Sequence, residues 1–184
     1  MRKLGAPLVA LLLLFSCTKS SKPEKFLSDR GYQVFFDQSY YVELEVPFDD
    51  VWATLLVALQ DLGWNVDTQT ETSGMITTEI ATMGTNRDRY ACPEWPGSKT
   101  RVDEMRCKLA VHVAPENETV TRVRASADIH GRYVYVTSRG DEKVGGWWPC
   151  TSTGKIESEL FDALLSRFEP LKYDPPVYRR WTSK

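Results

Sequence analysis

Hydrophobic and polar residues alternate in short runs along this chain, and one of these runs leads into a helical pattern. Residues 40–46 alternate between apolar and polar side chains, which predicts a half-buried strand that ends before Pro47. Apolar residues then recur every three or four positions as far as Gly63, a residue type that commonly follows a helix. The recurring positions are Val51, Leu55, Leu59 and Leu62. This pattern predicts a helix over residues 48–63 that packs against a sheet.

The rest of the chain returns mainly to the strand pattern. Two longer alternating runs, residues 107–113 and 122–129, flank a turn at Pro115–Glu118 and predict a hairpin. Residues 83–106 and 138–153 contain many glycines, prolines and charges, which predicts two long loops. A second helical period with an apolar face begins after Ser152-Thr153, at Ile156, and is stopped by Pro170. The fold class predicted from this order is α+β, with an antiparallel sheet and helices on one face.

The first residues indicate export to the bacterial envelope. Two positive residues precede an apolar stretch, residues 4–15, that is too short to span a membrane. The stretch ends in Leu14-Phe15-Ser16-Cys17, which resembles a bacterial lipobox, where the cysteine receives diacylglycerol and a further palmitate-type acyl chain. The alternatives are an ordinary secretory signal with a chance cysteine and an uncleaved anchor. Thr18 is not the aspartate that retains many lipoproteins at the inner membrane, which favours the outer membrane, facing the periplasm or the cell surface.

These features predict a four-part organisation of the chain. Residues 1–16 form the lipoprotein signal peptide, and residues 17–39 form a lipidated tether and approach segment. Residues 40–169 form one folded domain, and residues 170–184 an extended tail. The chain holds 23 Lys and Arg against 25 Asp and Glu, for a formal net charge of −2. This balance shows no basic excess of the kind that binds nucleic acid.

Several segments resemble the BamC-type lipoproteins of outer-membrane protein assembly. The matching residues are Pro47-Phe48-Asp49-Asp50-Val51-Trp52 at the helix start, Leu62-Gly63-Trp64 at its end and the segment 73–79. Residues 151–157 are similar to the start of the last helix in related small lipoproteins. The resemblance implies a helix-grip domain over residues 40–169, in which a curved antiparallel sheet holds a long helix. It also implies a role in outer-membrane protein assembly, although these are packing motifs.

The cysteines other than Cys17 predict a disulfide. Cys107 lies in phase with the apolar residues of its predicted strand, so we expect it to point into the core. Cys92 and Cys150 lie in the two predicted loops, which the path of the strands places at the same end of the sheet. A Cys92–Cys150 disulfide is therefore predicted in an oxidising compartment, with Cys107 bonded to either of them as the alternative.

Tryptophans in the same two predicted loops are candidate partner-binding residues. They are Trp95, Trp147 and Trp148. Exposed aromatic side chains on loops joined by a disulfide are typical of a binding surface. The alternative is that they pack on one another and on the disulfide as a small core.

The sequence contains no pattern typical of an enzyme. His112 and His130 lie on the polar phase of separate strands, and no converging ligands for a metal are visible. Nucleophile and phosphate-loop motifs are also missing, so we predict neither catalysis nor a cofactor. The predicted function is a non-enzymatic, lipid-anchored interaction or scaffold module with an envelope protein partner. The alternative is a periplasmic binder of a small apolar ligand between helix and sheet.

Overall fold

A large antiparallel sheet dominates the structure, a computed structural model that describes residues 24–27, 33–37, 39–85, 88–93 and 100–168. The strands in these residues are β1 (Glu24–Leu27), β2 (Gln33–Asp37), β3 (Ser39–Leu44), β4 (Val66–Thr70), β5 (Met75–Thr78), β6 (Ala81–Met83), β7 (Tyr90–Ala91), β8 (Thr100–Pro115), β9 (Thr121–Val136) and β10 (Glu142–Ser152). The helices are α1 (Phe48–Asp61), α2 (Lys155–Leu165) and the single-turn η1 (Glu71–Ser73). The main strand order is β1-β2-β3-β9-β8-β5-β4, with β10 paired to β9 and β7, and β6 paired to β8.

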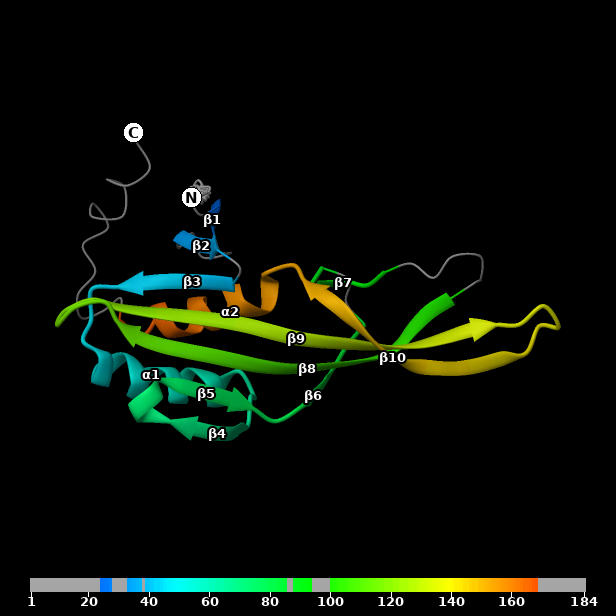
Figure 1. Cartoon of the computed structure of the whole chain (residues 1–184), viewed down its shortest axis with the longest axis horizontal. Coiled ribbons are helices and arrows are strands. Elements are labelled where there is room, and N and C mark those ends of the chain that lie inside the picture. The colour runs from blue at the N-terminus through cyan, green and yellow to red at the C-terminus, as the bar shows by residue number, and fades with distance from the viewer. Residues whose placement is uncertain (1–23, 28–32, 38, 86–87, 94–99, 169–184) are drawn as a thin grey trace, which may run out of the picture.

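The centre of the sheet is the hairpin of β8 and β9, whose strands are each 16 residues long (Figure 1). Its turn is held by Asn117, whose side-chain oxygen accepts hydrogen bonds from the backbone N–H groups of Thr119 and Val120, both at 2.9 Å. This Asx-type bonding explains why the polar segment reverses the chain there. The hairpin predicted from the two alternating runs is confirmed.

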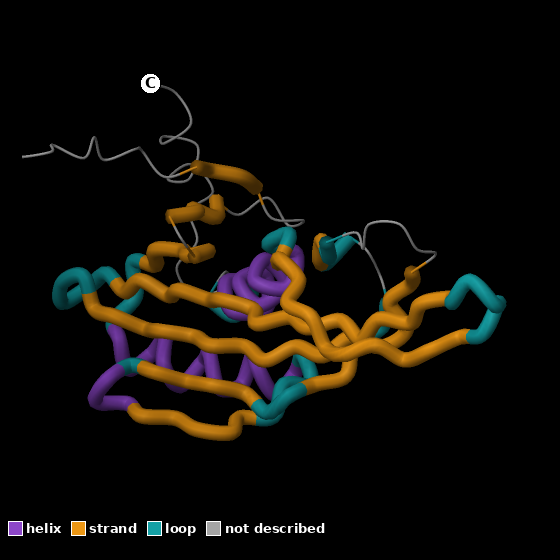
Figure 2. Tube along the Cα trace, turned by 45° about the vertical axis from the view of Figure 1, so that its right-hand side comes forward, coloured by secondary structure: helices purple, strands orange, loops and turns teal. Residues whose placement is uncertain are grey.

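Both helices pack on one face of the sheet, which we call the inner face, and lie behind the long strands in Figure 2. The side chains between the helices and the sheet are fully buried and include Leu55, Leu59, Leu109, Val111, Val123, Leu160, Phe161 and Leu164. The residues of β8 and β9 that belong to this core are the odd-numbered ones, as the two-residue period of a strand requires. The opposite face of the sheet, the outer face, carries the even-numbered residues of β9 and, from Glu104 onwards, of β8. Before Glu104 a register shift reverses the phase of β8, so Arg101 and Asp103 also lie on the outer face.

The predicted helix-grip architecture is wrong. A helix forms where the apolar period predicts it, but α1 has only 14 residues and α2 only 11. No long helix is held by a curved sheet in the described residues, and most of these residues belong to strands. The physical reason is that α1 is bounded at both ends and the long strands are not. Pro47 precedes α1 and the left-handed Gly63, with φ of 77°, follows it, whereas β8 and β9 continue past both helices.

Strands also occupy part of the first predicted long loop and most of the second. Residues 100–106 open β8, and residues 142–152 form β10, which pairs along β9. A β-bulge between Val144 and Trp147, at Gly145-Gly146, breaks the alternation and hides this strand from a reading of the sequence. Residues 24–27 and 33–37, which lie within the predicted tether and approach segment, add β1 and β2 to the sheet.

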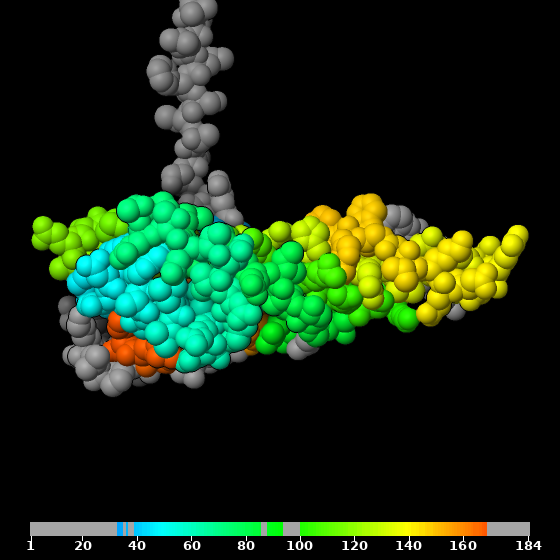
Figure 3. Space-filling model, turned by 90° about the horizontal axis from the view of Figure 1, so that it is seen from below, coloured from blue at the N-terminus to red at the C-terminus, as the bar shows by residue number. Residues whose placement is uncertain are grey.

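Three strands extend beyond the helices and form a narrow arm (Figures 1 and 3). We define the arm as residues 100–106 of β8, 131–136 of β9 and 142–149 of β10, which pair with one another. In the space-filling view the arm projects from the broader part of the molecule that contains α1. The arm contains two of the predicted partner-binding residues, Trp147 and Trp148.

Candidate interaction site

A disulfide at the base of the arm joins Cys92, which follows β7, to Cys150 on β10. The predicted pairing is therefore confirmed, and the Cα atoms of the two residues lie 4.3 Å apart. Beside the disulfide, β7 pairs with β10 through Ala91 and Thr151. The disulfide closes a chain segment of 58 residues, so it fixes the strand that carries the tryptophans to a distant part of the chain.

Cys107 is unpaired and buried, as its phase in the sequence predicted. Burial, reinforced by the charges of Glu157 and Asp128, raises the pKa of the Cys107 thiol to about 12. The thiol therefore stays protonated at neutral pH and is a poor nucleophile. It acts as a small apolar side chain of the core.

The disulfide packs tightly against β9 because Gly131 has no side chain. A Cβ atom at this position would lie 3.3 Å from the Cys150 sulfur and 3.2 Å from the sulfur of Met105. Two residues further along β9, the Tyr133 hydroxyl donates a hydrogen bond of 2.7 Å to the carbonyl of Pro93, next to the disulfide. These contacts fix the segment after β7 to the inner face of the arm.

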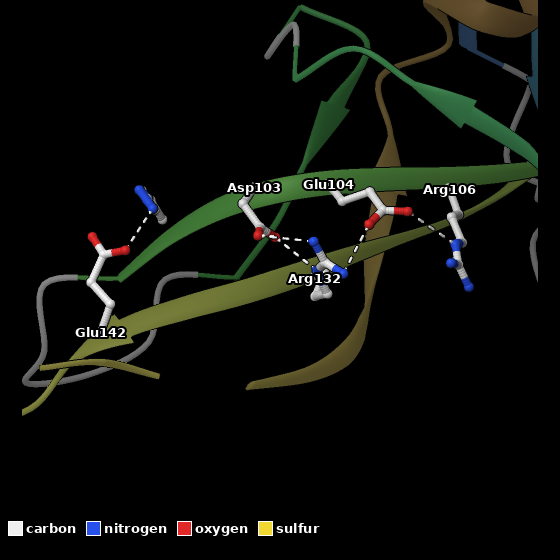
Figure 4. Close-up of polar contacts among 6 residues, drawn as sticks. Asp103, Glu104, Arg106, Arg132 and Glu142 are labelled. Carbon is white, nitrogen blue, oxygen red and sulfur yellow. Dashed lines mark hydrogen bonds and ion pairs between the residues drawn. The ribbon is translucent and has the colours of Figure 1, made fainter. Parts of the chain in front are cut away.

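The outer face of the arm carries a row of ion pairs, most of them drawn in Figure 4. The Arg132 guanidinium donates two hydrogen bonds of 3.1 Å to the Asp103 carboxylate, and its third nitrogen lies 3.0 Å from Glu104. A register shift between Val102 and Glu104 allows both acids to reach the same arginine. The hydrogen bond from Arg132, more than its charge, lowers the pKa of Asp103. Arg101 pairs with Glu142 at 3.0 Å.

Trp147 and Trp148 point to opposite faces of the arm because they are consecutive residues of one strand. Trp147 lies on the outer face, with the Cζ atoms of Arg106 and Arg132 at 4.1 Å and 5.9 Å from the centre of its ring. The stacking distance of Arg106 is that of a cation–π contact. Trp148 lies on the inner face, and its side chain is 42% exposed. The two further exposed apolar residues of the arm are Tyr135 and Val144, at 37% and 66%.

The structure therefore brings some of the predicted site residues together, whereas others lie outside the described residues. Trp147 and Trp148 lie in the arm next to Cys150 at its base, although on a strand and not in a loop. Cys17 and Trp95, and the tail at residues 170–184, lie outside the described residues. Sequence reasoning missed the arginines and acids of the outer face, because residues 100–106 were assigned to a loop. Their alternating charges would have been the signal, had the strand been extended to Thr100.

A buried carboxylate joins α2 to the sheet next to the arm. β3 pairs with β9 as far as Ala125 and β10 pairs from Ile129, which leaves the edge of β9 open at Ala127. Glu157, in the first turn of α2, fills this gap: its carboxylate accepts hydrogen bonds from the Ala127 N–H at 3.0 Å and the Ser152 hydroxyl at 2.7 Å. Burial raises the pKa of Glu157, and these two hydrogen bonds oppose the shift.

We expect this carboxyl group to make stability fall with rising pH. The pKa of Glu157 is higher in the folded than in the unfolded chain, so the folded state binds more protons between the two values. The contribution of Glu157 to the free energy of unfolding should therefore be complete below the ordinary pKa of this group. It should decrease as pH rises towards the raised pKa. Denaturant unfolding of wild type and Glu157→Gln between about pH 4 and 7 measures this decrease. As pH rises, the free energy of unfolding of the wild type should fall relative to that of the variant. Parallel curves would contradict this expectation.

The described residues contain no group of three side chains from His, Cys, Asp and Glu that could hold a metal ion. His112 is paired with Arg124 and His130 with Arg106, so the two histidines lie far apart along the hairpin. Among the described helices, none has the length and apolar character needed to cross a membrane. No family model and no curated protein matches the sequence, and the resemblance to BamC-type lipoproteins stays a prediction.

Proposed function

We propose that this protein is a non-enzymatic, lipid-anchored interaction module of the bacterial envelope, and that its arm binds a protein partner. The observation that carries the proposal is the arm itself: a three-stranded projection with Tyr135, Val144 and Trp148 exposed. Exposed aromatic residues on a rigid support lose little conformational entropy on binding, and tryptophan is enriched at the energetic centres of interfaces. The disulfide joins the base of the arm to the segment after β7, and the ion pairs of Arg132 link β9 to β8, which supports the strands that carry these residues.

The membrane part of the proposal rests on the sequence Leu14-Phe15-Ser16-Cys17, through which Cys17 would carry the lipid. We place the protein at the outer membrane because Thr18 follows this cysteine. A role in outer-membrane protein assembly is proposed from the BamC-type segments around α1 alone. Mass spectrometry of the native protein tests the anchor, and a mature protein without an acylated Cys17 would refute it.

The alternative function, binding of a small apolar ligand between helix and sheet, has no observation in its favour. The side chains at this place are Leu55, Leu59 and Phe161, and each is fully buried against its neighbours. In such close packing the apolar side chains already contact one another and not a ligand. The arm, in contrast, presents apolar groups to solvent.

We expect Trp148→Ala to lose the partner without unfolding the protein. Loss of a central tryptophan typically costs about 2 kcal/mol or more of binding, so recovery of a partner cross-linked in native membranes should fall by at least about tenfold. Ile80→Ala is the matched control, because Ile80 is 65% exposed but lies outside the arm. Thermal unfolding of each variant separates binding from folding. Equal partner recovery from wild type and Trp148→Ala would overturn the proposal.

A further inference from the structure

One arginine on the outer face of the arm has no carboxylate of its own within the part of the chain that the structure describes. Arg101 is matched by Glu142, and Arg132 by Asp103 and Glu104. Among the described residues, the one acid that Arg106 meets is Glu104, through its Nε atom at 3.4 Å, and the other oxygen of Glu104 is already bound to Arg132. The two terminal nitrogens of Arg106 have no hydrogen-bond partner among the described residues, and Figure 4 shows them turned away from the acids.

The same guanidinium group is held in place by its neighbours. It stacks on Trp147 at 4.1 Å, which fixes its plane and leaves its edge accessible, and its side chain is 46% exposed. The residue of β9 that is paired with Arg106 is His130, which is not an acid. A planar guanidinium with two free nitrogens binds a carboxylate through two parallel hydrogen bonds. Trp147 offers an apolar contact beside it. The exposed Val144 lies on the same face, further along the arm, where it pairs with Val134.

We infer that the outer face of the arm accepts an acidic segment of a protein partner, with a Glu or Asp carboxylate on Arg106 and an apolar side chain against Trp147 and Val144. This inference rests on the proposed function and names the chemistry of its partner. The charge pattern favours a protein segment over an anionic membrane surface, since Asp103, Glu104 and Glu142 lie around the arginines and would repel a continuous layer of negative charge.

The arm also favours recognition by side chains over the addition of a strand. From Glu142 to Pro149 the free edge of β10 has no strand partner within the described residues. The bulge after Val144 and the proline at position 149 disrupt the row of backbone donors that an added strand would need. The partner segment would therefore lie on the outer face and be selected through its carboxylate.

An NMR titration tests this inference on the full-length protein held in phosphatidylcholine nanodiscs. The probes are a short acetylated peptide containing Glu-Leu-Glu and its Gln-Leu-Gln counterpart. We expect the Arg106 Nε–H and Trp147 indole signals to shift with the acidic peptide, and its affinity to exceed that of the amide peptide by about tenfold. Arg106→Gln should lose this preference. Arg101→Gln is the matched control and should keep it, because Arg101 is already paired with Glu142.

Two results would overturn the inference: equal binding of the two peptides, or equal effects of Arg106→Gln and Arg101→Gln. A shift of the Arg106 signal that needs phosphatidylglycerol in the nanodiscs, and no peptide, would assign the site to a lipid headgroup and would also overturn it. The outcome is separable from that of the proposed function. Loss of the membrane partner in Trp148→Ala together with a negative peptide result would keep the interaction module and refute only its acidic occupant.

Discussion

Replacing both Cys92 and Cys150 by serine should lower the free energy of unfolding by about 4 kcal/mol. The two residues are 58 positions apart, and closing a loop of this length removes chain entropy from the unfolded state, which gives about 4 kcal/mol at room temperature. Denaturant unfolding of the double variant and the wild type under non-reducing conditions measures the difference. The expected loss is a large part of the stability of a typical domain.

Reduction provides the matched control for this double variant. A reducing agent should lower the stability of the wild type to that of Cys92→Ser/Cys150→Ser and should leave the variant unchanged, because Cys107, the cysteine that remains among the described residues, is already unpaired. Stability of the variant within about 1 kcal/mol of wild type would contradict the prediction. Peptide mapping without reduction checks the pairing itself, and a cross-linked peptide containing Cys107 would refute it.

The disulfide was predictable from the sequence because two simple rules were enough. Cys107 shares the phase of Leu109, Val111 and Val113, and a residue in that phase of a strand points into the core. Cys92 and Cys150 then remained as the two cysteines that could pair with each other, once the hairpin had been recognised. The same period-based reasoning located α1 and the β8–β9 hairpin, since long, strongly periodic segments depend little on the rest of the fold.

The arm was not predictable, because its strands contain glycines, a proline and many charges, which in a sequence are typical of loops. Gly145-Gly146 and Pro149 indicate a loop in the sequence, whereas the structure uses them as a bulge and a protected edge of β10. The charges of residues 100–106 also indicate a loop. They become a strand face because arginines and acids meet across β8 and β9, and this matching depends on a register that local sequence does not reveal.

The helix-grip prediction failed for a related reason. Its basis was a set of packing residues at the two ends of α1, Pro47 to Trp52 and Leu62 to Trp64. Such residues determine where a helix starts, where it ends and which side it buries, and the structure agrees on these points. They contain no information on how far the strands extend past the helix, which is what separates this sheet from one that surrounds a helix.

Gly74→Ala should destabilise the protein by more than about 3 kcal/mol, because a backbone oxygen occupies the place of the new methyl group. Gly74 follows η1 with φ of 64°, a left-handed conformation, and a Cβ atom there would overlap the carbonyl oxygen of Val113 in β8. The Gly74 carbonyl also accepts the Val113 N–H at 2.8 Å, so the two backbones cannot separate without losing this bond. Thermal or denaturant unfolding measures the effect.

Gly63 is the matched control, because it separates the conformational cost from the clash. It has φ of 77°, in the same left-handed region, but a Cβ atom at Gly63 would have no neighbour within 4 Å. Gly63→Ala should therefore cost only the conformational term, about 1–2 kcal/mol. If Gly74→Ala were no worse than Gly63→Ala, the contact between Gly74 and Val113 would be looser than the structure has it, and β5 would have room to move along β8.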